Sequence, residues 1–273
     1  MPRKDHRHKL RVKAVTFDLW ETLLFEKEGY SDARSSVRCK NLVNALKELG
    51  IEVSFEGVNF ALNETRSSLL KIWDANRDVA HSDQIKLFIK HLLGNSFAVK
   101  EEWLNPLSSA YISALFEVPP YLNLDAHEIL RWLKSRDKNV GIICNTGLTP
   151  GFGLKQFIER ENIAKHFDVM MFSDEVGIRK PDSRIFLLAA EKLKVEPCKV
   201  VHVGDNLRTD VWGAKNAGFK AVHLLCESGR DRKAESNPTS LVSLSRKLGS
   251  LRAEDIVPDA TINSLAILKN LLI

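Results

Sequence analysis

The sequence predicts an α/β fold, in which a parallel β-sheet is interrupted after its first strand by a long all-helical insertion. Five short runs rich in β-branched residues each suit a strand buried on both faces. Segments of helical period separate the later runs, and strands that alternate with helices form parallel sheets through right-handed crossovers. The gap between the first and second runs contains no convincing strand, which indicates the insertion.

The predicted strands span residues 12–17, 139–144, 168–173, 199–204 and 220–225. Two segments between them carry apolar side chains on one helical face, which predicts amphipathic helices over 124–134 and 182–195. Residues 227–258 are polar and rich in serine and arginine, so we expect a surface loop there.

The insertion divides the chain into a core and a second, helical domain. We expect residues 1–25 to form the first part of the core, with a basic tail over 1–11, residues 26–118 the helical domain, and residues 119–273 the second part of the core. Helical periodicity within the insertion predicts helices over 36–50, 60–73, 82–93 and 101–116. Gly50 is a plausible helix stop, and Pro119-Pro120 marks the return to the sheet.

Composition excludes several classes of protein. The 273 residues are 44% hydrophobic and 27% charged, which is ordinary for a globular protein and not for a collagen or a disordered chain. The four cysteines form no CxxC pair, so neither disulfides nor a zinc site is expected. No 18-residue apolar run and no secretory leader are visible, so we expect a cytoplasmic protein without a membrane partner.

The net charge of +5 does not predict a nucleic-acid partner. The first 13 residues contain six basic residues and one acidic residue, so the tail accounts for the whole excess. Phosphate backbones are bound by a cationic face, which a neutral body lacks.

Ionisable side chains follow several of the predicted strands. Asp18 comes directly after strand 12–17, Asp205 and then Asp210 follow strand 199–204, and Lys180 lies beyond strand 168–173. Parallel strands end at one edge of a sheet, where open α/β sheets bind ligands. A strand-end aspartate could attack phosphorus, while the ammonium group offsets negative charge. Clustered carboxylates repel one another without a cation, so we expect Mg²⁺, which prefers hard oxygen ligands.

Four ordered motifs carry a family resemblance. They read VTFDLWETL, IICNTG, GIRKPDSRIF and VHVGDNLRTDVWGAKNAG, and the region that contains them covers residues 12–226. In this order, each after a predicted strand, they resemble the haloacid dehalogenase (HAD) superfamily of phosphatases and related hydrolases. The resemblance implies a HAD-like Rossmannoid core with a C1-type helical cap inserted after the first motif.

The resemblance also implies roles for individual residues. Asp18 would be the nucleophile and a metal ligand, and the backbone carbonyl of Trp20 would be a second ligand. Asp205 would be the acidic metal ligand of the fourth motif. Asp210 would orient Lys180 or hold a metal-bound water, and Lys180 would bridge Asp18 and the transferring group.

Further residues are candidate contacts for a small anionic substrate, a phosphate ester or anhydride. Small polar groups at the sheet edge are Thr22, Asn145 and Thr146. The family places a hydroxyl where this chain has Cys144, whose thiol is a poor donor. Two cap residues four apart, Arg34 and Arg38, share a helical face and could clamp the anion, although they could also lie on a solvated face.

The first motif departs from the phosphatase pattern. Phosphatases of this superfamily usually carry a second aspartate two residues after the nucleophile, and this chain has Trp20 there. An indole cannot act as a general acid, and we expect the neighbouring Glu21 to point elsewhere on an extended segment.

Three functions remain open on the sequence. A Mg²⁺-dependent phosphohydrolase with an aspartyl intermediate is favoured by Asp205 and Asp210. A 2-haloacid dehalogenase-like hydrolase is favoured by Trp20, because halide leaves without a proton and family dehalogenases have an aromatic residue there. The third is a HAD-fold binding or assembly protein with little turnover. The sequence leaves the oligomeric state open.

Overall fold

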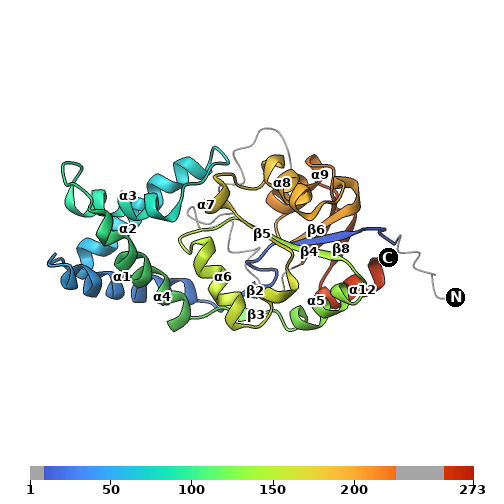
Figure 1. The fold of residues 1–273 in the computed structure, drawn as a ribbon, viewed down its shortest axis with the longest axis horizontal. Helices are drawn as coiled ribbons and strands as arrows, with labels where there is room; N and C mark the ends of the chain where they lie inside the picture. Colours follow the sequence, from blue (N-terminus) through green and yellow to red (C-terminus); the bar gives the residue numbers. More distant parts are fainter. Residues whose placement is uncertain (1–8, 226–254) are drawn as a thin grey trace.

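The computed structural model describes residues 9–225 and 255–273. The first eight residues of the basic tail and most of the predicted loop 227–258 lie outside this part. Figure 1 shows a sheet with helices on both faces and a group of helices at one end of the molecule. The predicted α/β fold with a parallel sheet is confirmed. None of the helices in the two described ranges combines the length and apolarity that a membrane span needs.

The sheet has six strands in the order β5-β4-β1-β6-β7-β8, and every neighbouring pair is parallel. Their bounds are β1 (Ala14–Phe17), β4 (Asn139–Cys144), β5 (Val169–Phe172), β6 (Val200–Gly204), β7 (Lys220–Leu224) and β8 (Ala260–Ile262). All four residues of β1 are buried, as its central place requires. The ends of β1 and β6 are adjacent because Phe17 pairs with Val203.

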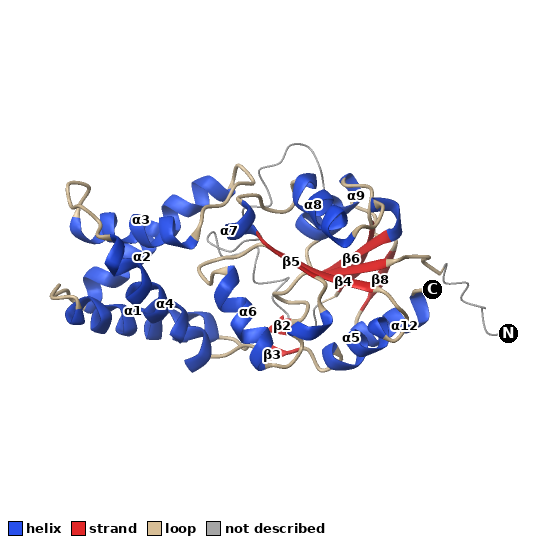
Figure 2. Ribbon diagram, viewed as in Figure 1, coloured by secondary structure: helices blue, strands red, loops and turns tan. Residues whose placement is uncertain are grey.

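Alternate residues of the strands face two separate layers of helices, which Figure 2 shows above and below the sheet. One face packs against α5 (Ala126–Lys134), α6 (Gly151–Arg160) and α12 (Leu268–Leu271). The opposite face packs against α8 (Ser183–Leu193) and α9 (Gly213–Asn216). The helices predicted over 124–134 and 182–195 correspond to α5 and α8.

The insertion forms four helices that pack around an apolar core of their own. They are α1 (Tyr30–Glu48), α2 (Phe55–Trp73), α3 (His81–Leu93) and α4 (Leu104–Glu117). Gly50 follows α1 in a left-handed conformation with φ of 78°, which suits the helix stop expected there. We refer to these four helices as the cap.

Three short strands were not predicted. The chain enters the cap through β2 (Leu24–Phe25) and leaves it through β3 (Tyr121–Leu122), which pair as an antiparallel ribbon. The third is β8 at the edge of the main sheet. Strands of two or three residues are too short to show an alternating pattern. The remaining short helices are η1 (Glu101–Trp103), η2 (Ala164–His166), α7 (Ser173–Val176), η3 (Pro197–Lys199), η4 (Leu207–Trp212) and η7 (Leu265–Ile267).

Candidate active site

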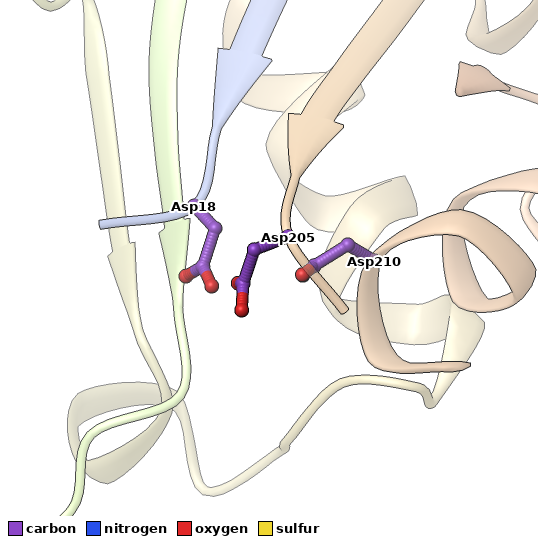
Figure 3. Close-up of side chains that lie close together, drawn as sticks. All are labelled: Asp18, Asp205 and Asp210. Atoms are coloured by element: carbon purple, nitrogen blue, oxygen red, sulfur yellow. The ribbon is translucent and has the colours of Figure 1, made fainter. Parts of the chain in front are cut away.

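Three carboxylates meet at the carboxyl edge of the sheet. Asp18 follows β1, Asp205 follows β6, and Asp210 comes from η4 (Figure 3). One oxygen of each lies within 4.8 Å of the others. These residues are distant in sequence, and the adjacent ends of β1 and β6 bring them together.

Lys180 joins two of the three carboxylates. Its Nζ lies 2.8 Å from Asp18 Oδ1 and 2.6 Å from Asp210 Oδ1, and its side chain is almost fully buried. Burial acts to lower the pKa of Lys180, but the two carboxylates outweigh it and raise the pKa above its usual value. The ammonium group is therefore charged at every physiological pH.

Asp18 is positioned through one of its two oxygens. Oδ1 accepts hydrogen bonds from the Leu19 amide, at 2.7 Å, and from Lys180. Oδ2 accepts none from the described residues. Burial raises the pKa of Asp18 to about 6, and Lys180 opposes this rise.

Asp210 is held from several sides. Its Oδ2 accepts a hydrogen bond from the backbone N–H of Asn206 at 3.0 Å. Its Oδ1 accepts from Lys180 Nζ and, at 3.3 Å, from His202 Nε2. His202 Nδ1 lies 2.9 Å from Thr16 Oγ1. Burial lowers the pKa of His202, so the neutral ring donates from Nε2 and accepts at Nδ1. His202 is thus a hydrogen-bonded core residue that orients Asp210, a role that its strand position alone did not indicate.

Asp205 differs from its neighbours because its carboxylate accepts no hydrogen bond from any described residue. Burial and the charges of Asp210 and Asp18 raise its pKa well above the usual value. His223 contacts only its backbone, with Nε2 2.8 Å from the Asp205 carbonyl oxygen. Three close carboxylates opposed by one ammonium group make an electrostatically incomplete site, which suits a divalent cation.

The second motif supports the site from behind. Asn145 exchanges two 2.8 Å hydrogen bonds with the backbone of Lys180, one through Nδ2 and one through Oδ1. The fully buried Thr146 hydroxyl lies 3.0 Å from Ser173 Oγ, and Cys144 is fully buried. The side chains of Asn145 and Thr146 therefore have internal partners in this structure, and their contact with substrate stays a prediction.

The first motif turns sharply after Trp20. Glu21 has a φ of 54°, so the segment is not extended as expected. Glu21 lies near enough to Asp205 that its charge adds slightly to the rise in the pKa of Asp205. Thr22 Oγ1 is fully buried and has no hydrogen-bond partner in the described part of the chain.

The two cap arginines lie at the boundary with the core, and both are buried, not on a solvated face. Arg34 forms an ion pair with Glu26, and its Nε and Nη2 donate to the Val118 carbonyl oxygen. Its guanidinium carbon lies 5.7 Å from the centre of the Trp20 ring. Arg38 contacts Thr149 in the loop after β4, with Nη2 3.4 Å from Oγ1.

A buried ion pair between Asp78 of the cap and Arg179 of the core was not predicted. We call it the cap–core ion pair. Asp78 also accepts from Trp73 Nε1 at 2.9 Å and from Ser173 Oγ at 2.6 Å. Its backbone amide donates to the Gly177 carbonyl at 3.1 Å. The pair lies one residue from Lys180, so it connects the cap to the loop that carries this lysine.

Comparisons with known proteins find relatives over most of the chain. The chain is 31% identical to the glyceraldehyde 3-phosphate phosphatase of Pyrococcus furiosus over 218 residues, 78% of this chain and 80% of that protein. Its fold is similar to that of 2-haloacid dehalogenase from Pseudomonas syringae pv. Tomato, with a TM-score of 0.64 at 23% identity, covering 95% and 97% of the two chains. A HAD phosphatase from Thermococcus onnurineus gives a TM-score of 0.56 at 23% identity, covering 94% and 96%.

These two structural similarities show only the fold, which a dehalogenase and a phosphatase share. The family model described as haloacid dehalogenase-like hydrolase matches residues 12–218, which contain the cap and all four site residues Asp18, Lys180, Asp205 and Asp210. The chain therefore belongs to the haloacid dehalogenase-like hydrolase family.

Proposed function

We propose that this hydrolase is a Mg²⁺-dependent phosphohydrolase that acts on a small phosphate ester or anhydride through an aspartyl phosphate at Asp18. The observation that carries the proposal is the contact of Lys180 with Asp18 and Asp210 beside a third carboxylate, Asp205. The named activity of the relative from Pyrococcus furiosus, a phosphatase, supports phosphate over halide.

The donor set suits Mg²⁺. Asp18, Asp205 and the Trp20 carbonyl would hold the ion, with Asp210 nearby to orient its water. A divalent cation would offset the mutual repulsion of the carboxylates, for which one ammonium group is not enough. When bound, Mg²⁺ supplies Lewis-acid polarisation of the phosphoryl oxygens.

Asp18 and Lys180 have separate roles in the proposed reaction. Asp18 Oδ2 attacks phosphorus, the bond from phosphorus to the leaving oxygen breaks, and an acyl phosphate forms on Asp18. Lys180 stays protonated and offsets the charge of the nucleophile and the phosphoryl oxygens. Water then attacks the acyl phosphate, which releases inorganic phosphate and restores the Asp18 carboxylate.

The departing oxygen lacks the usual proton donor, because Trp20 stands where phosphatases of this family carry an aspartate. General acid catalysis contributes on the order of 10² to 10⁴ in rate. The cost of losing it is small for a leaving group that is stable as an anion, such as a phenolate or a carboxylate. The proposed enzyme should therefore favour aryl and acyl phosphates over alkyl phosphates.

The test compares turnover of p-nitrophenyl phosphate and acetyl phosphate with that of glycerol 3-phosphate, in wild type and Asp18→Asn. We expect kcat/KM on the first two to exceed kcat/KM on the third by at least about 100-fold, because kcat/KM reports the step that expels the leaving group, whereas hydrolysis of the acyl phosphate is common to all three. Asp18→Asn should abolish all three activities. Comparable kcat/KM values on all three substrates, each lost in Asp18→Asn, would show that another group protonates the leaving oxygen.

A second candidate function is hydrolytic dehalogenation, and Trp20 is the observation that favours it. Halide needs no proton, so an aromatic residue in place of the acid costs nothing. Chloride release from 2-chloropropionate without Mg²⁺, together with no phosphate release from any phosphate ester, would establish this function instead.

A further inference from the structure

Buried polar groups lie together at the boundary between the cap and the core. They come from α1 and α3 of the cap and face Tyr111 of α4 and residues 149–152 of the core. Arg38 and His81 are only 3% and 7% exposed, so solvent contributes little to satisfying either group.

Arg38 is a buried cation that forms no close ion pair with a described residue; Glu26 acts on it only at longer range, and its guanidinium carbon lies 4.4 Å from the centre of the Tyr111 ring. Its Nε donates to the Tyr111 carbonyl at 3.3 Å and its Nη2 to Thr149 Oγ1 at 3.4 Å, both near the long limit for a hydrogen bond. No carboxylate of a described residue pairs with it. Arg34, one helical turn away, is neutralised by Glu26, so Arg38 is the cation of the two that remains available.

His81 has no hydrogen bond at either ring nitrogen within the described ranges. Its ring packs edge-on against Tyr111, with centroids 5.1 Å apart, and tilted against Phe152 at 5.4 Å. A neutral imidazole carries one donor and one acceptor, and leaving such groups unpaired inside a protein costs free energy. Gln84 Oε1, one turn further along α3, is also buried without a partner.

We propose that Arg38 and His81 bind a second anionic group of the substrate, a carboxylate or a phosphate, while its ester phosphate meets Asp18. The anion would accept hydrogen bonds from the free N–H groups of Arg38 and from one ring nitrogen of His81. It would also neutralise the buried guanidinium.

The position of this subsite relative to Asp18 supports the assignment. Trp20 is two residues from the nucleophile, Arg34 lies over its ring at 5.7 Å, and Arg38 is one further turn of α1 away. Arg38 also contacts Thr149, in the loop after β4 whose Asn145 bonds the Lys180 backbone, so the subsite lies against the loop that supports the catalytic lysine. The inference rests on the proposed function, because it assumes that the group at Asp18 is a phosphate.

The first test uses matched substrates that differ in the distal anion. Fructose 1,6-bisphosphate against fructose 6-phosphate tests a distal phosphate, and 3-phosphoglycerate against glycerol 3-phosphate tests a distal carboxylate. We expect kcat/KM to favour the doubly anionic member of at least one pair by about tenfold or more. Arg38→Gln should reduce that preference about tenfold. Lys40→Gln, which removes an exposed charge from the same helix, should preserve it.

Equal kcat/KM values within both pairs in wild type would overturn the inference while leaving the proposed function in place. An undiminished preference in Arg38→Gln would overturn it as well.

The second test measures binding without turnover. Calorimetry on Asp18→Asn with fructose 1,6-bisphosphate and fructose 6-phosphate should show a tighter dissociation constant for the first, by about tenfold. Adding His81→Phe keeps the ring packing and removes both unpartnered nitrogens, so it should weaken bisphosphate binding without lowering the melting temperature. A lower melting temperature of the His81→Phe variant with unchanged bisphosphate binding would assign His81 a structural role and overturn the proposal. If no substrate is hydrolysed, the proposed function fails, and this binding comparison decides the subsite by itself.

Discussion

Gly204 lets Asp210 approach the end of β6. A Cβ built on Gly204 would lie only 2.5 Å from Asp210 Oδ2, a distance at which something must move. The glycine of the fourth motif is therefore required by packing, and the carboxylate that it admits orients Lys180. Lys180, His202 and the Asn206 amide then fix that carboxylate in one orientation.

Gly204→Ala should displace Asp210 and with it Lys180. We expect a folded protein whose kcat on p-nitrophenyl phosphate falls about 100-fold, the size of effect that a displacement near 1 Å produces in a catalytic site. Gly147→Ala is the control, because its added Cβ meets no atom within 4 Å. It should retain far more activity. Equal losses in the two variants would show that the close approach to Asp210 is unimportant.

His81 should make the protein sensitive to acid. Burial and then the charge of Arg38 lower its pKa from 6.5 to about 4. A depressed folded-state pKa gives stability that is present above pH 6.5 and is lost as the pH falls toward 4. Between pH 7 and pH 5, the free energy of unfolding of His81→Phe should therefore fall by about 1–2 kcal/mol less than that of wild type. Urea denaturation at both pH values measures the difference, and identical losses would contradict it.

Between elements, the loop from α2 to α3 also joins the cap to the core, in addition to the β2–β3 ribbon and the contact of Arg38 with Thr149. Asp78 lies in this loop, and Arg179 lies between α7 and α8. The guanidinium of Arg179 stacks on Trp73 at 4.4 Å, so a cap aromatic also covers the pair. The cap is thus attached to the core at more than one point.

Asp78→Ala should be strongly destabilising. Arg179 would stay buried without its counter-ion, which costs about 3–5 kcal/mol. Glu175→Gln is the control, since it breaks a half-exposed pair with Lys155 and should cost under about 1 kcal/mol. Both values come from urea denaturation monitored by circular dichroism. A cost for Asp78→Ala no larger than that of the control would show that the cap–core ion pair contributes little.

The sequence predicts features that are encoded by neighbouring residues, and it does not predict contacts between distant loops. Strand β4 matches its predicted range 139–144, because five apolar or small residues follow Asn139 without interruption and form a clear pattern. The meeting of Asp18, Lys180 and Asp210 followed from parallel strands ending at one edge. The cap–core ion pair could not be predicted, because Asp78 and Arg179 lie in loops without periodicity. The internal partners of Asn145 likewise depend on the path of the loop after β5.

At the scale of the whole molecule, the cap carries Arg34 and Arg38 at its boundary with the core, while the core carries Asp18, Lys180, Asp205 and Asp210. Under the proposed function, this arrangement would separate the chemistry from the selection of the substrate. Changes in the cap should then alter KM and substrate preference, and changes at Asp18 or Lys180 should abolish turnover. The absence of nucleic-acid and membrane partners, and a cytoplasmic location, stay predictions from composition.

The most direct test of the central claim is phosphate release from p-nitrophenyl phosphate, measured in wild type and Asp18→Asn after chelation and after Mg²⁺ is restored. The account predicts hydrolysis only in wild type with Mg²⁺, because the attacking carboxylate and the cation that offsets the acidic cluster are both required. Hydrolysis that survives chelation, or that survives in Asp18→Asn, would contradict it.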